Sequence, residues 1–196
     1  MKQLKYSLLC EDEASRITIS ILFERMLAGM VSCTFDNTYF KQFRCSNNKD
    51  VLKALPQASA YIVLPKYNLD LLLAGIDYDD RHRDKFEEEL AYLYSKVNKV
   101  AKDKTIIFFP VQAIEHWIHF LQHKIENPSS TKNISDRVEG TNRKELKLKV
   151  YKDSLDKTAL VAEVVSKGDI DWLTERSKSF RKFREQVISF TNIFTK

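Results

Sequence analysis

The chain has 196 residues, which is enough for one domain with a sizeable hydrophobic core, and its 43% hydrophobic and 30% charged residues are typical of a soluble globular protein. No window approaches the length of a transmembrane helix, and acids interrupt the first apolar residues, so we expect neither a membrane span nor a signal peptide. The net charge of +5 is compatible with a polyanionic partner but does not establish one.

The three cysteines are Cys10, Cys33 and Cys45. They are odd in number and have neither a CxxC spacing nor the spacing of a Cys/His zinc finger. Buried, reduced thiols in a cytoplasmic protein are therefore expected.

The hydrophobic pattern predicts strands that alternate with helices. In chain order it predicts a strand at 4–10, a helix at 14–30, short strands at 31–35 and 39–46, a brief helix at 50–55 closed by Pro56, a strand at 69–76, a helix at 86–100, a strand at 105–109 stopped by Pro110, and helices at 111–125, 154–168 and 169–194. This alternation favours an α/β fold with a mostly parallel, Rossmann-like sheet and additional C-terminal helices.

We expect an α/β core at 1–126, a polar loop at 127–143 and a C-terminal helical segment at 144–196 that packs on the core. The strands at 4–10 and 69–76 are almost continuously apolar, which is typical of interior strands of a parallel sheet. They are therefore expected to be parallel neighbours.

Acidic residues follow both of these strands. The first ends in Glu11, Asp12 and Glu13, and the second ends in Asp77, Asp79 and Asp80. Functional groups gather beyond the carboxyl ends of strands in open α/β sheets, and a hard divalent cation relieves repulsion between carboxylates. The alternative is that the acids cap and begin the following helices. Two clusters together, with Asp77 and Asp79 on one side of an extended chain, favour a metal site.

The order of four short motifs resembles the Toprim family, whose fold is shared by topoisomerases, bacterial primases and the overcoming-lysogenization-defect nucleases. "CEDEAS", "GIDYDD", "AIEHWI" and "KSFRKF" follow one another as in the small stand-alone Toprim proteins of bacterial phage-defence loci. The resemblance covers residues 4 to about 188. The sequence departs from the family at Asp12, where glycine is usual, and at Ser15, where a second acid often stands.

The resemblance implies a Toprim-like fold and a nuclease that depends on Mg²⁺ or Mn²⁺ and cleaves phosphodiester bonds. It makes Glu11, Asp77 and Asp79 the metal ligands and catalytic residues, with Glu11 a candidate general acid or base. Further candidate ligands are Glu13, Asp80 and Glu115, although Glu115 is equally compatible with an ordinary surface glutamate. Such proteins are often encoded beside an ATPase of the ABC or overcoming-lysogenization-defect kind. The resemblance therefore implies an anti-phage effector with an ATPase partner, since the chain has no P-loop of its own.

Two basic stretches are candidates for binding nucleic acid. Arg81, Arg83 and Lys85 follow the second acidic cluster, where they could hold a phosphate backbone or pair with the acids at 87–89. The stripe that contains Arg176, Lys178, Arg181, Lys182 and Arg184 is the strongest basic footprint in the chain. Solvated charge on a helix surface explains this stripe equally well.

Three histidines, His116, His119 and His123, have the spacing of helical zinc ligands. They lie opposite Ile114 and Leu121, so a solvent-exposed polar face is the favoured interpretation.

Two other functions remain open. One is a phosphorelay receiver domain, because "LLCEDE" is similar to the acidic strand end of receivers. The other is a non-catalytic Toprim scaffold, which the departures at Asp12 and Ser15 leave possible. The sequence does not distinguish DNA from RNA or tRNA as the substrate.

Overall fold

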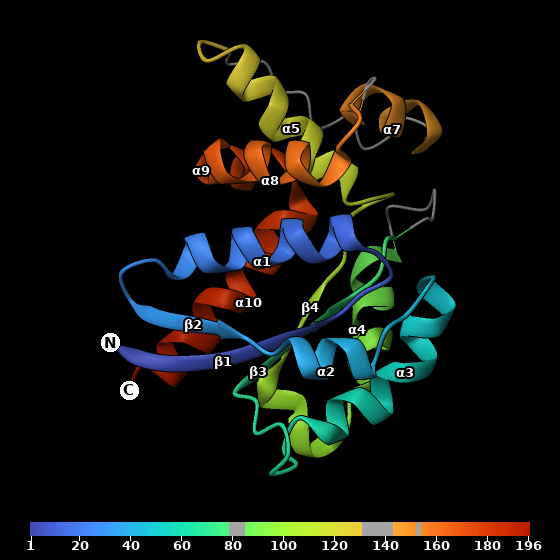
Figure 1. Ribbon diagram of the computed structural model, residues 1–196, viewed down its shortest axis with the longest axis vertical. Helices are drawn as coiled ribbons and strands as arrows, with labels where there is room; N and C mark the ends of the chain where they lie inside the picture. Colours follow the sequence, from blue (N-terminus) through green and yellow to red (C-terminus); the bar gives the residue numbers. More distant parts are fainter. Residues whose placement is uncertain (79–84, 131–142, 152–153) are drawn as a thin grey trace.

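The structure is a computed structural model that describes residues 1–78, 85–130, 143–151 and 154–196. It has an α/β fold around a parallel four-stranded sheet in the order β2-β1-β3-β4 (Figure 1). The strands are β1 (Lys2–Leu9), β2 (Val31–Phe35), β3 (Leu71–Gly75) and β4 (Thr105–Phe108). The expected fold class, with a parallel sheet and additional C-terminal helices, is confirmed.

The helices occupy most of the rest of the described chain. They are α1 (Glu13–Leu27), α2 (Asn37–Gln42), α3 (Asn48–Tyr61), α4 (Phe86–Lys96), a 3₁₀ helix (Lys99–Lys104), α5 (Glu115–Glu126), α7 (Arg143–Tyr151), α8 (Lys157–Lys167), α9 (Ile170–Arg176) and α10 (Lys178–Phe194). Several begin at a side chain that accepts a hydrogen bond from the first helical turn, as Asp156 does for α8 and Asp169 does for α9.

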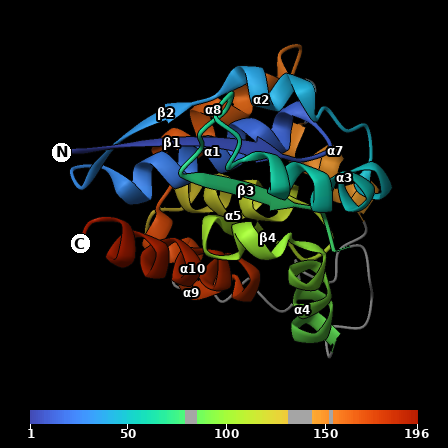
Figure 2. The same ribbon diagram turned by 90° about the horizontal axis from the view of Figure 1, so that it is seen from below.

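Helices cover both faces of the sheet. One hydrophobic cluster joins the sheet to α2, α3 and α4, and the other joins it to α1, α5 and the C-terminal helices. Figure 1 shows α1 on one side of the strands and α2 and α3 on the other. Helix α8 packs on α1, and α10 packs on β4 and α1. The two chain ends lie side by side (Figure 2), and Lys2 Nζ donates to the Phe194 carbonyl at 2.8 Å.

The two apolar strands are parallel neighbours in the interior of the sheet, as predicted. Leu8 of β1 lies opposite Leu73 of β3, and Leu9 lies opposite Ala74. All five residues of β3 are buried, because helices cover both of its faces. Gly75 ends this strand, where a Cβ atom would lie 2.1 Å from the Phe108 carbonyl oxygen, so no side chain fits there.

The strand predicted at 39–46 is wrong. Residues Asn37–Gln42 form the short helix α2, which begins where the Asp36 side chain accepts a hydrogen bond from the Tyr39 amide at 2.8 Å. The Tyr39 ring is buried and its hydroxyl donates to the Ala58 carbonyl of α3 at 2.6 Å. Aromatic residues favour strands locally, but this cap and the packing on α3 decide in favour of a helix.

The prediction that Pro56 ends a brief helix is also wrong, since α3 continues through Pro56 to Tyr61. Proline removes one backbone hydrogen bond and strains the preceding turn. The helix persists because Val51, Leu55 and Ala58 are buried on one face against the sheet. Tertiary packing therefore outweighs the local preference.

The predicted helix at 86–100 ends early, at Lys96. Val97 is its C-terminal cap, and Val100 lies in the 3₁₀ helix with 65% of its surface exposed. The spacing of apolar residues therefore continues beyond Lys96, although the helix ends there.

The cysteines form no disulfide. Cys10 and Cys45 are buried and Cys33 is half-buried, and burial raises the pKa of Cys33 and of Cys45 to about 11. The thiols are therefore protonated at neutral pH, where they are poor nucleophiles. Within the described ranges, no helix is both long enough and apolar enough to cross a membrane.

The outer edge of β4 is closed by a side chain of α10. The Gln186 amide nitrogen donates to the Ile107 carbonyl at 2.9 Å, and the Ile107 amide donates to Gln186 Oε1 at 3.1 Å. The Tyr94 hydroxyl of α4 also donates to Gln186 Oε1. Gln186 thus takes the place of a neighbouring strand and satisfies an edge that would otherwise be open for pairing.

Replacing Gln186 with leucine should lower the free energy of unfolding by about 1–3 kcal/mol, because both polar groups of Ile107 would lose a buried partner. Chemical denaturation monitored by circular dichroism measures the change. Gln57→Leu is a control for the substitution itself, since among the described residues the Gln57 side chain bonds only to the Tyr61 hydroxyl, at the protein surface. Equal stability of the two variants would show that Gln186 does not stabilise the β4 edge.

Candidate functional site

The candidate site lies at the carboxyl edge of the sheet, between β1 and β3. In the order β2-β1-β3-β4 the connections turn in opposite directions on either side of this pair. Open α/β sheets bind their ligands in the crevice at such a switch point. The last paired residues of the two strands are Leu9 and Ala74, so Glu11 and Asp77 follow the paired region by two and three residues. Because paired strands are about 4.8 Å apart, the two acids leave the sheet from neighbouring positions at the same edge.

Two of the acids that follow β1 have structural partners. Asp12 caps α1, and its Oδ1 accepts a hydrogen bond from the Ser15 amide at 2.8 Å. Glu13 is exposed and its two carboxylate oxygens pair with Nε and Nη2 of Arg16, which lowers the pKa of Glu13. The capping interpretation thus holds for Asp12, and Arg16 competes with any metal for Glu13. Glu11 is half-buried and lines a cleft.

Asp77 follows β3 and is almost completely buried, with 6% of its surface exposed. Its Oδ1 accepts a hydrogen bond from the Ile114 amide at 2.9 Å, at the N-terminal end of α5. A carboxylate is stabilised at the N-terminus of a helix by the free amides and by the helix dipole. Asp77 is therefore held in one position by the helix that follows β4.

A tight turn brings α5 against Asp77. Gln112 has φ +64°, and across it the Ala113 amide donates to the Val111 carbonyl at 2.9 Å. The Tyr78 and Val111 backbones pair just before this turn. Such a turn is uncommon for a residue with a side chain and stores strain, which in proteins is concentrated at functional sites. Its effect here is to place Ile114 and Glu115 beside the end of β3.

Glu115 is the most deeply buried acid of the site, with 2% of its surface exposed. Its Oε1 accepts a hydrogen bond from the Tyr151 hydroxyl at 3.1 Å and lies 3.3 Å from Lys147 Nζ, both on α7. Its Oε2 is buried without a hydrogen-bond partner among the described residues. An ordinary surface glutamate is therefore excluded, and a buried carboxylate oxygen is left for a ligand to satisfy.

The pKa of Tyr151 links three parts of the site. Burial raises this pKa above its ordinary value, and the negative charges of Glu115, Asp12 and Asp77 raise it further. These carboxylates come from α5, from the end of β1 and from the end of β3. Each of them is thus close enough to Tyr151 to act on its phenol.

Carboxylate oxygens, as in Glu11, Asp77 and Glu115, are the type of ligand that a hard cation such as Mg²⁺ prefers. Within the described ranges, however, no group of three His, Cys, Asp or Glu side chains could hold an ion on its own. Asp79 and Asp80 lie outside the described residues, as do Arg81 and Arg83. Glu11, Asp77 and Glu115 therefore do not form a complete three-residue metal site by themselves.

Two other motifs of the sequence analysis pack against each other behind the site. Trp117 Nε1 of α5 donates to Ser179 Oγ of α10 at 3.0 Å. The Trp117 ring contacts the rings of Phe180 and Phe183, with ring centres 5.1 and 5.9 Å apart. These residues fix the first turn of α5, which carries Glu115, relative to α10.

The prediction that the histidine face of α5 is exposed to solvent is wrong. His116 has 1% of its surface exposed, and His119 and His123 are half-buried. The His123 ring stacks on Trp172 of α9, with ring centres 6.2 Å apart. The C-terminal helices surround α5, so a face that is polar in sequence is nevertheless covered.

The basic stripe of α9 and α10 is held by contacts within the chain. Lys178 and Lys182 lie 4.0 and 3.6 Å from the Glu87 carboxylate of α4. Arg181 donates to backbone carbonyls at the end of α9, and Arg184 lies 2.7 Å from Asp171. Arg176 lies over the Trp172 ring. Lys85 is exposed at the beginning of α4. The cations of the stripe therefore take part in contacts within and between helices.

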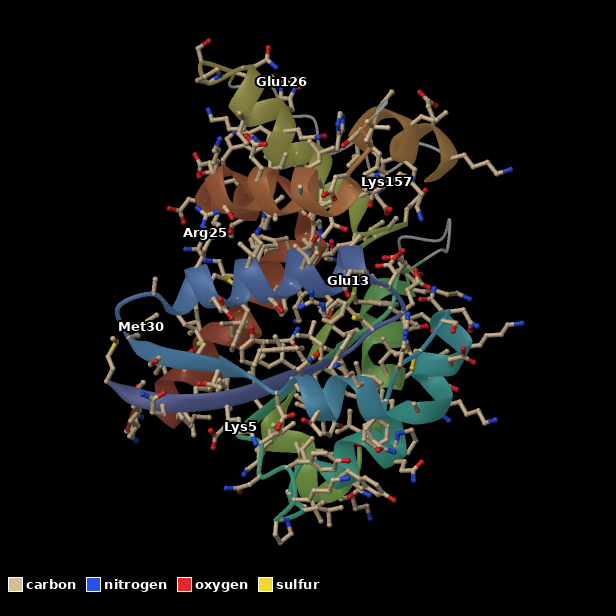
Figure 3. All side chains as sticks on the ribbon, in the orientation of Figure 1. Lys5, Glu13, Arg25, Met30, Glu126 and Lys157 are labelled. Atoms are coloured by element: carbon tan, nitrogen blue, oxygen red, sulfur yellow. The ribbon has the colours of Figure 1, made fainter. Side chains whose placement is uncertain are left out.

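Two clefts of about 660 Å³ each open on either side of the first turn of α1, and Asp12 and Glu13 line both. The first cleft contains Glu11 and carries Arg16, Lys41 and Arg44. The second contains Glu115 and carries Lys144, Lys147 and Lys157. Figure 3 shows Glu13 and Lys157 at the same end of the molecule, where α1 and α8 begin. Sequence reasoning missed these cations because they come from segments that are far apart in the sequence and meet only in the fold.

Comparison with protein-family models, with curated proteins and with solved structures finds no match for this chain.

Replacing Tyr151 with phenylalanine should lower the free energy of unfolding by about 1–3 kcal/mol near neutral pH, because the buried Glu115 carboxylate would lose a hydrogen bond. Urea denaturation measures the change. Adding Glu115→Gln in a double-mutant cycle should reduce the effect of the tyrosine substitution, whereas additive effects would show that the two side chains do not interact.

The same variant should change the alkaline limb of the stability curve. The folded protein keeps the Tyr151 proton at a pH where the unfolded chain loses it, so the wild type should lose stability as the pH rises above about 10. Tyr151→Phe removes this contribution, and its free energy of unfolding should fall less steeply with pH. Parallel alkaline limbs would contradict a raised pKa.

Proposed function

We propose that this protein is a metal-dependent enzyme that cleaves phosphodiester bonds of nucleic acid, with its centre between the ends of β1 and β3. The observation that carries the proposal is the position of Glu11 and Asp77. They follow neighbouring parallel strands at the switch point of the sheet. Glu115 on the adjoining helix has a buried Oε2 that bonds to none of the described residues, which adds a carboxylate near this edge. These three acids do not by themselves form a group that could hold an ion, so the proposal includes further ligands, for which Asp79 and Asp80 are the candidates from the sequence.

The resemblance of the four motifs to Toprim nucleases supports the same reaction. The two acidic motifs end β1 and β3, the third begins α5 and the fourth begins α10. The last two motifs contact each other through Trp117 and Ser179. Residues from all four motifs therefore belong to one end of the sheet or to the packing directly behind it. By the same resemblance, we propose Mg²⁺ or Mn²⁺ as the cofactor.

A bound divalent ion would supply charge stabilisation at the phosphate and a more acidic water. The roles of the chain follow from its own contacts. Asp77 is oriented by the Ile114 amide, so it is fixed before any ligand binds. Glu115 is oriented by Tyr151 and Lys147. Glu11 lines the open cleft and is the acid placed to exchange a proton with water or with a leaving oxygen.

The receiver hypothesis fits the geometry less well. A phospho-acceptor aspartate must be open to its phosphate donor, whereas Asp77 has 6% of its surface exposed and already accepts a hydrogen bond. A non-catalytic scaffold is favoured by one observation, namely that Arg16 occupies both oxygens of Glu13. Activity distinguishes a scaffold from an enzyme. An ATPase partner and a role in anti-phage defence rest on the motif resemblance.

Asp77→Asn and Glu11→Gln should each lower cleavage of DNA or RNA in Mg²⁺ or Mn²⁺ by about 100-fold or more, because an amide is a poor ligand for a hard cation. Melting temperatures should be kept or raised, since each change removes a negative charge from an acidic cluster. Asp79→Asn is expected to behave in the same way. Assays are run with and without an added ATPase of the overcoming-lysogenization-defect kind, the partner class that the motif resemblance implies.

Asp12→Asn is the matched control for these substitutions. It removes one carboxylate from the same loop, but asparagine caps a helix about as well as aspartate, so cleavage should be retained. Unchanged cleavage by Asp77→Asn would contradict the proposal. A wild type that never cleaves would leave the scaffold as the better explanation.

Metal binding is measured separately from activity. Mg²⁺ or Mn²⁺ at about 100 times its dissociation constant should stabilise the wild type by about 2.7 kcal/mol, and EDTA should reverse the effect. Asp77→Asn should lose this stabilisation. Triple replacement of His116, His119 and His123 by glutamine should leave the metal-dependent shift in melting temperature unchanged, whereas loss of the shift would place the metal at the histidines.

A further inference from the structure

We infer that nucleic acid contacts this protein through Arg16, Lys41 and Arg44, on the rim of the cleft that contains Glu11, rather than through the basic stripe of α10. The inference rests on the proposed function for its choice of ligand, a polynucleotide phosphate backbone. The binding surface itself is drawn from the geometry of the cleft. We call these three residues the rim cations.

The rim cations come from separate parts of the fold that meet at the cleft. Arg16 lies in the first turns of α1, Lys41 lies in α2, and Arg44 lies in the segment that leads to α3. Arg44 and Glu13 line the same cleft. The cleft thus has acids near the ends of the strands and cations around its edge, as an enzyme needs to hold a phosphate chain over a metal site.

The internal contacts of the two sets of cations favour the rim cations over those of α10 as the phosphate-binding surface. Glu87, Asp171 and backbone carbonyls already hold the cations of α10. By contrast, Lys41 and Arg44 are exposed and form no hydrogen bond or salt bridge with the described residues. Binding a phosphate would therefore break an internal contact on α10 but none at these two side chains. Charges that need no rearrangement lose less free energy when they bind.

The lining of the cleft favours a polynucleotide over a small organic ligand. Sites for small molecules are mostly apolar with a few polar groups, whereas half of the described residues that line this cleft are charged. The cations also continue past the first turn of α1 into the second cleft, where Lys144, Lys147 and Lys157 lie. A chain of phosphates can follow cations on both sides of Asp12 and Glu13, but a single small anion cannot.

The test compares two double variants with the same change of charge. Lys41→Gln with Arg44→Gln removes two rim cations, and Lys178→Gln with Lys182→Gln removes two cations of α10. Each changes the net charge from +5 to +3. Long-range attraction therefore weakens equally, and only local contact distinguishes the two proteins. Binding of labelled DNA and RNA oligonucleotides is followed by fluorescence anisotropy over a range of salt, in EDTA and in Ca²⁺.

The rim variant should bind more weakly, by on the order of 10- to 100-fold near 0.1 M salt, and the slope of log K against log salt should shrink by about 2. The α10 variant should keep the wild-type slope. Lys41→Arg with Arg44→Lys should restore binding, which separates lost charge from altered folding. Circular dichroism and melting temperature verify that each variant is folded.

Three outcomes would overturn the inference. They are equal weakening of both variants, weakening of the α10 variant alone, and no oligonucleotide binding by the wild type. Displacement of the oligonucleotide by stoichiometric inorganic phosphate or mononucleotide would likewise show a site for small anions. Binding that depends on the rim in a protein that never cleaves would uphold the inference and reject the proposed nuclease.

Discussion

The parallel pairing of β1 with β3 is the constraint on which the rest of the site depends. It places the carboxyl ends of two buried strands side by side, so Glu11 and Asp77, which are 66 positions apart in sequence, reach one edge. Burial of both strands fixes the register, because both faces of the sheet are packed against helices and a slip would disrupt both hydrophobic clusters. The positions of the acids thus follow from the hydrophobic core.

The helices around this edge supply hydrogen-bond donors to the buried carboxylates. The turn at Gln112 directs α5 so that its first amides approach Asp77, and α7 places Tyr151 and Lys147 over Glu115. Each buried carboxylate therefore has a donor that orients it. This arrangement is costly for folding, because charges buried together repel and lose hydration. Its retention at one edge of the sheet is what a site for a cation or a reacting group requires.

Two groups of basic side chains have different surroundings in the structure. On α10 they join helices to one another, as Lys182 does with Glu87 and Arg184 does with Asp171. Around the Glu11 cleft, Arg16 is paired with Glu13, whereas Lys41 and Arg44 are exposed. Basic residues are closely spaced at 176–184, where five of nine residues are Lys or Arg. In space these cations already contact Glu87, Asp171, Trp172 and backbone carbonyls, so a phosphate would have to displace those contacts.

The sequence by itself determined the class of fold, the interior strands and the acids that follow them, because apolar runs and strand-end acids are local patterns. It misjudged α2, Pro56 and the histidine face of α5, where a cap, a packed helix face and surrounding helices outweigh local preference. Only the tertiary structure decided that Glu115 is buried with one oxygen that no described residue satisfies, that Asp12 is a cap, and that Lys41 and Arg44 line the cleft. These properties depend on neighbours distant in sequence, and burial and pairing are set by the whole fold rather than by any one segment.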